Sequence, residues 1–184
     1  MNFTLPPLGI NILLATLSVI AAFSDIRARR IPNWLTLSGV IAGFGMNAFL
    51  YEGWPGLSLS LGGLAVGFGV YFVLYLLRAM GAGDVKMMAA VGAMVGFRDW
   101  IGIFLLTALI GGVAALALVT ARGRFRKTVW NVGFILSEMK SGRPAWIGSE
   151  ELDVRNPKAV GLPHGAVIAT ATFLFLGLSA RFNH

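Results

Sequence analysis

Long apolar runs, separated by short polar stretches, dominate this chain. Six runs approach the length that an α-helix needs to cross a bilayer, because about 20 residues rising 1.5 Å each cover a hydrocarbon core of about 30 Å. We therefore predict an all-α, polytopic membrane protein whose six transmembrane helices form one bundle. The predicted spans are residues 8–24, 34–50, 57–77, 85–97, 101–120 and 160–180.

The predicted span at residues 85–97 is short for a complete crossing. It can cross only where the bilayer thins, or where protein and water rather than lipid surround its ends. A re-entrant segment is the alternative prediction for this run.

One long polar segment, residues 121–159, interrupts the apolar pattern. Its first part, residues 127–140, gathers apolar side chains on one helical face and places Lys127 and Glu138 on the other. This pattern predicts an amphipathic helix lying on the inner leaflet of the membrane. The remainder, residues 143–158, contains prolines and glycine and predicts an irregular loop.

The composition agrees with a membrane protein and excludes an ordinary water-soluble domain. Hydrophobic residues make up 57%, charged residues 12%, and the mean hydropathy is +0.77. We predict a single transmembrane domain over residues 1–184. The first run follows no basic residue and precedes no small-residue cleavage site, so it should remain in the mature protein.

The charge distribution predicts the orientation in the membrane. With the N-terminus outside, thirteen of the fifteen Lys and Arg residues fall on the cytoplasmic side, and Arg98 and Arg181 fall outside. This asymmetry is the one that the positive-inside rule requires. The net charge of +7 then places basic loops beside anionic lipid, so membrane lipid is the expected partner and nucleic acid is not.

Few residues offer ligands for a metal. The chain has no cysteine, and its two histidines, His164 and His184, are scattered. Disulfides and thiolate zinc sites are excluded on this basis, and we expect neither a metal nor a cofactor. Any chemistry should therefore use carboxylates.

Glycine is abundant, with 24 residues, and several glycines recur four residues apart. Such small-xxx-small spacing predicts close packing between transmembrane helices. The pairs are Gly39 with Gly43, Gly63 with Gly67, and Gly92 with Gly96.

Two aspartates occupy the predicted boundary between membrane and cytoplasm. Asp25 follows the first apolar run and Asp84 precedes the fourth, so the chain reaches the same border from opposite directions. A charged side chain within a membrane costs roughly 2.5 to 3.5 kcal/mol at a helix centre, so such acids usually mark a functional site. Two carboxylates a few ångströms apart share a proton, and one can then act as general base while the other acts as general acid.

Both aspartates also have structural explanations. Asp84 follows Gly83 and could cap the N-terminus of a helix, where its charge suits the helix dipole. Asp25 follows a helix C-terminus, where a negative charge is disfavoured, and could pair with Arg27 or Arg29.

Two short stretches around these aspartates resemble a known family. They are Asp25-Ile26-Arg27 followed by Arg30-Ile31-Pro32-Asn33, and Gly81-Ala82-Gly83-Asp84-Val85-Lys86. Together and in this order they resemble the signature stretches of the type IV prepilin peptidases. The stretch Leu162-Pro163-His164-Gly165 is also similar to the one that opens the final helix of that family.

The resemblance implies an aspartic endopeptidase of the bacterial inner membrane with Asp25 and Asp84 as its catalytic residues. Its substrate would be a prepilin or pseudopilin, cut at the cytoplasmic face between a basic leader and an apolar helix. The chain looks like the short form of tight-adherence (Flp-type) pilus systems, without the N-terminal domain that is associated with methylation.

Neighbouring residues receive simpler predictions. Lys86 lies about 200° around a helix from Asp84, so we expect it to point away and reach lipid headgroups. Pro32 and Asn33 predict the turn and cap that begin the second helix, and Met88 is expected in the core. His164 should be either a polar lining residue or an interfacial histidine with a backbone partner.

Two other classes of function remain open from the sequence. Paired acids in a membrane also serve proton-coupled transporters, and a non-catalytic subunit of pilus assembly is a further alternative. Transport favours acids near the middle of the membrane and repeated halves, whereas Asp25 and Asp84 lie at one predicted face.

Overall fold

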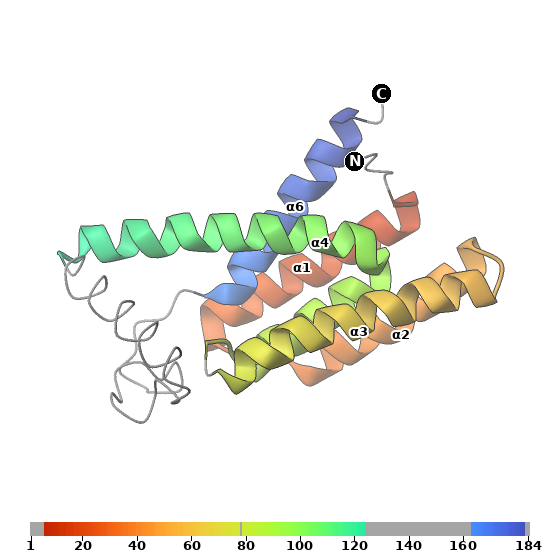
Figure 1. Ribbon diagram of the computed structural model, residues 1–184, viewed down its shortest axis with the longest axis horizontal. Coiled ribbons are helices and arrows are strands. Elements are labelled where there is room, and N and C mark those ends of the chain that lie inside the picture. Colours follow the sequence, from red (N-terminus) through yellow and green to blue (C-terminus); the bar gives the residue numbers. More distant parts are fainter. Residues whose placement is uncertain (1–5, 78, 124–162, 183–184) are drawn as a thin grey trace, which may run out of the picture.

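The computed structural model describes residues 6–77, 79–123 and 163–182, and every secondary-structure element in these residues is an α-helix (Figure 1). The prediction of an all-α protein is therefore confirmed. The helices are α1 (Leu8–Ala28), α2 (Asn33–Leu50), α3 (Trp54–Leu76), α4 (Ala82–Ala121) and α6 (His164–Phe182). The predicted amphipathic helix at residues 127–140 lies outside the described residues.

Residues 98–100, between the predicted spans at 85–97 and 101–120, are helical and do not form a connecting loop. The helix is broken instead at Gly96, whose φ of 76° and ψ of 176° are not helical. Arg98 and Asp99 suggested a loop, but they lie in the first turn after this break. The label α4 thus covers two helical segments, one on each side of Gly96, which correspond to the two predicted spans.

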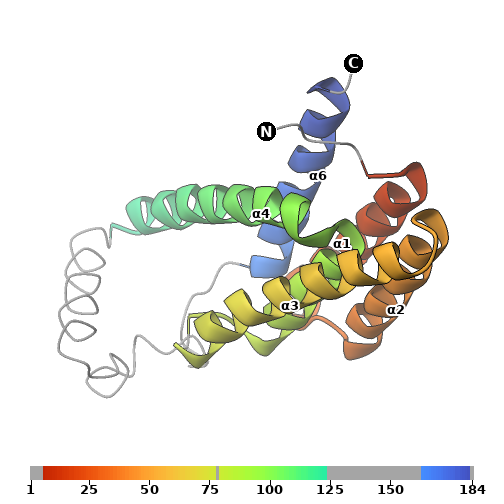
Figure 2. The ribbon, with the colours of Figure 1, turned by 45° about the vertical axis from the view of Figure 1, so that its right-hand side comes forward.

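The two segments of α4 fold back on each other. Figures 1 and 2 show the chain reversing direction after its first segment has run along α3. The indole Nε1 of Trp100 donates a hydrogen bond to the carbonyl oxygen of Met88 at 3.1 Å. In a straight helix the same residues would be about 18 Å apart. The break at Gly96 therefore produces a helical hairpin.

A buried asparagine supports this break. The side-chain amide of Asn47, on α2, donates to the carbonyl oxygens of Ala93 at 3.1 Å and of Met94 at 3.0 Å. In an unbroken helix those carbonyls would accept from the amides of residues 97 and 98. Asn47 also donates to the Ser60 hydroxyl at 2.9 Å, and both side chains are almost completely buried.

Close glycine contacts bring α3 against the first segment of α4. A Cβ atom on Gly63 would overlap the backbone of Gly92, and a Cβ on Gly92 would overlap the backbone of Gly63. The predicted role of these glycines in helix packing is confirmed. The contact fixes the first segment of α4 within the bundle, and with it the position of Asp84.

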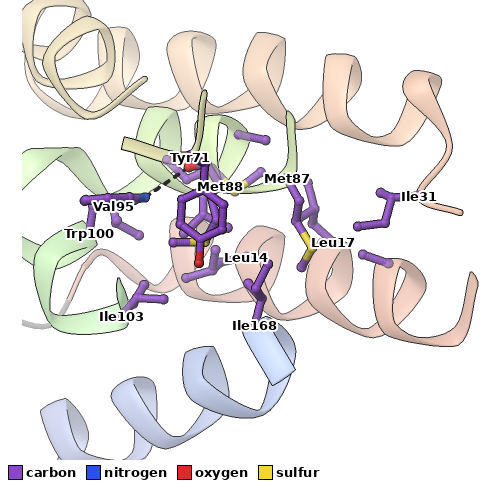
Figure 3. Close-up of a cluster of buried hydrophobic side chains, with 14 of the residues drawn as sticks. Leu14, Leu17, Ile31, Tyr71, Met87, Met88, Val95, Trp100, Ile103 and Ile168 are labelled. Atoms are coloured by element: carbon purple, nitrogen blue, oxygen red, sulfur yellow. Dashed lines mark hydrogen bonds between the residues drawn. The ribbon is translucent and has the colours of Figure 1, made fainter. Parts of the chain in front are cut away.

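The core lies between the first segment of α4 and the helices around it (Figure 3). Met87 and Met88 are fully buried there beside Leu14 of α1 and Ile168 of α6. The core position predicted for Met88 is confirmed. The Trp100 ring stacks on Phe104, with ring centroids 5.2 Å apart.

Four of the described helices, α1, α3, α4 and α6, are long and apolar enough to cross a membrane. Helix α2 is not among them, although it exposes large apolar side chains such as Trp34, Ile41 and Phe49. Exposed apolar surface on long helices is characteristic of proteins embedded in lipid. The predicted count of six membrane crossings is not confirmed.

Candidate active site

Asp25 lies in the last turn of α1, which extends four residues beyond the predicted end of the first span. The helix ends at Ala28, and Arg29 follows in the left-handed conformation with φ 53°. The Arg29 amide donates to the backbone oxygen of Asp25 at 2.8 Å. The Asp25 side chain is 8% exposed, so the fold has withdrawn most of it from solvent.

The Asp25 carboxylate is held by a residue far along the chain. The backbone amide of Gly165 donates to its Oδ2 at 2.8 Å in a buried hydrogen bond. Gly165 lies in the first turn of α6, where backbone amides have no partner within their own helix. The amides and dipole of that N-terminus favour a negative charge, which compensates for the position of Asp25 near the C-terminus of α1.

Asp84 is the third residue of α4 and stabilises the start of that helix. The Gly81 amide donates to Asp84 Oδ2 at 3.1 Å, and the Asp84 amide donates to the Gly81 carbonyl oxygen at 3.1 Å. The capping role proposed for Asp84 is therefore present in the structure. It uses one carboxylate oxygen and leaves the other for a further interaction.

Both aspartates line one cavity of about 460 Å³, a volume within the range of ligand-binding pockets. The cavity is formed by the residues of the two signature stretches and by little else. Its lining residues are Asp25, Arg29, Arg30, Ile31, Pro32, Asn33, Gly81, Ala82, Gly83, Asp84 and Lys86. The structure thus brings together the two aspartates that the sequence predicted to meet.

Two contacts join the signature stretches beside this cavity. Gly83 packs on Ile31, where an added Cβ would lie 3.4 Å from the Ile31 Cβ. The ammonium Nζ of Lys86 donates to the side-chain oxygen Oδ1 of Asn33 at 2.8 Å. The start of α4 is therefore fastened to the start of α2.

The predicted roles of Lys86 and Asn33 need correction. Lys86 does not extend away from the site but lines the cavity, and Asn33 makes no side-chain capping bond at the start of α2. Pro32 directly precedes that helix as its N-cap residue, with an extended backbone rather than the predicted turn. The angle of 200° from Asp84 was a sound estimate, but it could not show that α2 rather than lipid lies in that direction.

The cavity falls within the part of the chain that matches a known family. Residues 12–116, more than half of the 184 residues, match the type IV leader peptidase family. The chain belongs to the type IV leader peptidase family. The match includes both aspartates and ends before α6, so the Gly165 contact with Asp25 comes from outside the matched region.

A curated relative agrees with this membership in the leader peptidase family. The chain is 30% identical over 120 residues to a prepilin leader peptidase/N-methyltransferase of Myxococcus xanthus. The aligned part covers 61% of this chain and 35% of that protein, so the chain spans about a third of the length of its relative. No solved structure matches the chain.

His164 of this leader peptidase family member begins α6, directly before Gly165. Its ring centroid lies 6.1 Å from that of Tyr71, and its Nε2 atom is buried without a hydrogen-bond partner among the described residues. It is not one of the residues that line the cavity. His164 is thus not a lining residue of this cavity, and its Nε2 has no backbone partner among the described residues. The prediction of an interfacial histidine whose other ring nitrogen has a backbone partner stays a prediction.

The described residues offer few side chains that could bind a metal ion together. Within them, no group of three or more His, Cys, Asp or Glu side chains is close enough to hold an ion. The two carboxylates and the lysine of the cavity are thus the groups with acid and base chemistry at this site.

Proposed function

We propose that this chain is a membrane-embedded aspartic endopeptidase that removes the basic leader of prepilins or pseudopilins. Its catalytic residues would be Asp25 and Asp84. The observation that carries the proposal is that both carboxylates line the same cavity, at the junction of the two signature stretches of a leader peptidase family member.

The site can perform peptide hydrolysis with a single shared proton. One aspartate, as carboxylate, takes a proton from water while the water oxygen attacks the scissile carbonyl carbon. The other aspartate, as carboxylic acid, gives its proton to the carbonyl oxygen. The first aspartate then gives the proton that it took from water to the leaving nitrogen as the C–N bond breaks. A hydroxyl of the tetrahedral intermediate returns a proton to the second aspartate as the new carboxyl group forms, so the pair again holds one proton.

The hydrogen bonds in the structure support this proposal, because in each aspartate a backbone amide binds one of the two carboxylate oxygens. Gly165 holds Oδ2 of Asp25, and Gly81 holds Oδ2 of Asp84. Among the described residues, no hydrogen bond is given to either Oδ1 atom, which we assign to water, substrate or the shared proton. Fixed donors of this kind orient a catalytic group without reorganisation during the reaction.

The location of the cavity suits a substrate whose cleavage point follows a basic leader. By the positive-inside rule the junction of the signature stretches faces the cytoplasm, beside Arg29 and Arg30. An apolar substrate helix would pack in the bilayer of the bacterial inner membrane, and its charged leader would stay in the cytoplasm. A few residues at the cleavage point must unwind to present an extended backbone.

The test is leader removal from a co-expressed prepilin, read by N-terminal sequencing of the product. Asp25→Asn and Asp84→Asn should each lower the cleavage rate by at least about a hundredfold, as expected when a general acid or base is lost. Both variants should still be inserted in the membrane. Cleavage near the wild-type rate by either variant would refute the aspartate pair and favour a transporter or an assembly subunit.

A further inference from the structure

One lysine that lines the cavity is held in place by a neutral side chain. Lys86 lies two residues after Asp84 on α4, is exposed, and lines the same cavity as both aspartates. Its ammonium group is held at 2.8 Å by Asn33 Oδ1, a neutral acceptor. Among the described residues, the structure shows no ion pair between this ammonium and a carboxylate.

This arrangement is unusual for a lysine beside two acids. An ion pair with either aspartate would neutralise the ammonium and fix the carboxylate in its ionised form. The Asn33 amide oxygen instead accepts one of the three N–H donors and leaves the positive charge in the cavity. The site therefore offers a positioned cationic donor as well as two acids.

A peptide substrate needs such a donor. An extended segment at a membrane border has carbonyl oxygens that no longer bond within a helix, and leaving them unpaired is costly. The two carboxylates are mainly acceptors and satisfy few carbonyls. Lys86 can donate to one of them while Asp25 and Asp84 act on the scissile bond.

We propose that Lys86, positioned by Asn33, binds a backbone carbonyl of the extended substrate beside the scissile peptide bond. The inference rests on the proposed peptidase function and adds a substrate-binding residue to it. A basic leader side chain is disfavoured at this point by the ammonium charge, so the leader's cations lie outside the cavity.

The experiment separates substrate binding from the fastening of α4 to α2. A synthetic peptide with a basic leader, a glycine and the start of an apolar helix is titrated against detergent-solubilised protein carrying Asp84→Asn, so that cleavage does not interfere. Added to this background are Lys86→Met, Lys86→Arg and Asn33→Ala. Arg122→Met serves as matched control, because Arg122 is exposed, follows the end of α4 and does not line the cavity.

Lys86→Met should raise the Kd roughly tenfold to a hundredfold, the effect of losing a charged hydrogen bond. Lys86→Arg should stay within about threefold, because it keeps a cationic donor, and Asn33→Ala should fall between the two. Arg122→Met should bind like its parent. The thermal midpoints of all four should agree within a few degrees.

Two results would overturn the proposal. One is peptide binding by Lys86→Met that equals the parent, or absence of binding in every protein. The other is an equal loss in Lys86→Met and Asn33→Ala with a matching fall in thermal midpoint, which would show that Lys86 only fastens the helices. Cleavage by Asp84→Asn in the otherwise unchanged chain would instead count against the aspartate pair, and the binding result would stand separately.

Discussion

The two ends of this helical bundle both bury polar side chains, but they use them differently. At the Gly96 break, Asn47 is 1% exposed, and its side-chain Nδ2 donates to two backbone carbonyl oxygens and to the Ser60 hydroxyl. At the opposite end, each of the two aspartates has one oxygen bound by a backbone amide and also lines a cavity. Burial of a polar side chain in a membrane protein therefore does not by itself identify a catalytic residue.

The difference lies in the hydrogen-bonding capacity that the fold leaves unused. Around the break, the side-chain N–H groups of Asn47 donate to carbonyl oxygens that an interrupted helix leaves without their usual partners. Around the cavity, amides of Gly81 and Gly165 hold the carboxylates without satisfying them. The first arrangement stabilises a break in a helix, and the second holds two carboxylates that line a cavity.

The largest difference in cleavage rate should be between substitutions of Asp25, at the cavity, and Asp99, beside the Gly96 break. Asp99 is buried like Asp25 but lies after the break in α4, remote from the cavity lining. We expect Asp99→Asn to retain prepilin cleavage within about threefold, whereas Asp25→Asn loses at least about a hundredfold. The measurement is the initial rate of leader removal per amount of inserted protein. An equal loss of cleavage rate in both variants would contradict the proposal that Asp25 is catalytic and Asp99 is not.

Much of the end that holds the cavity could be predicted from sequence, because its residues occur in two short stretches and apolar runs define the helices around them. The pairing of Asp25 with Asp84 followed from their shared depth. Gly165 as a partner of Asp25 could not be predicted, since 140 residues separate them and only tertiary packing joins them. One signal was present: a carboxylate at the end of α1 needed a donor from elsewhere.

A break between residues 85 and 120 was predicted, but its position at Gly96 was not. Charged residues between two apolar runs suggested a loop at 98–100, but an acid in the first turn of a new helical segment is favourable. Asp99 occupies that position after Gly96. Periodicity shows where a helix can exist, but it does not show that Asn47 on another helix supports an interruption.

The next largest effect should come from the amide that holds Asp25. A Cβ on Gly165 would lie 3.0 Å from the Asp25 Cβ and 3.1 Å from its Oδ2, so Gly165→Ala must displace the carboxylate. We expect kcat to fall about tenfold or more with little change in KM, because positioning rather than substrate binding is disturbed. The cleavage assay with varied peptide concentration measures both constants.

Gly177→Ala is the matched control for that substitution. Gly177 lies in the same helix and an added Cβ there meets nothing within 4 Å. Both changes raise helix propensity equally, so a shared effect on α6 would appear in both variants. A normal kcat for Gly165→Ala, or an equal loss in Gly177→Ala, would contradict a positioning role for the α6 N-terminus.

At the other end, removing the Asn47 side chain should affect stability rather than chemistry. Asn47→Ala leaves the carbonyls of Ala93 and Met94 without this donor and should cost about 1 to 3 kcal/mol of unfolding free energy. The cleavage rate per folded molecule should stay near that of the wild type. Asn11→Ala is a suitable control, because Asn11 makes a single bond to the Pro6 carbonyl near the N-terminus. A large loss of activity without loss of stability would assign the break a catalytic role.

Metal removal should have the smallest effect of all. The proposed chemistry uses the carboxyl groups of Asp25 and Asp84 and no metal ion. The chain has no cysteine, and its described residues contain no cluster of three metal-binding side chains. EDTA should leave the cleavage rate unchanged, with Mg-EDTA at the same concentration as the control for effects on the lipid. Inhibition by EDTA alone that added zinc reverses would require a metal-activated water in place of the shared proton. The two carboxylates would then be ligands, and the contrast between the ends of the bundle would be one of metal binding.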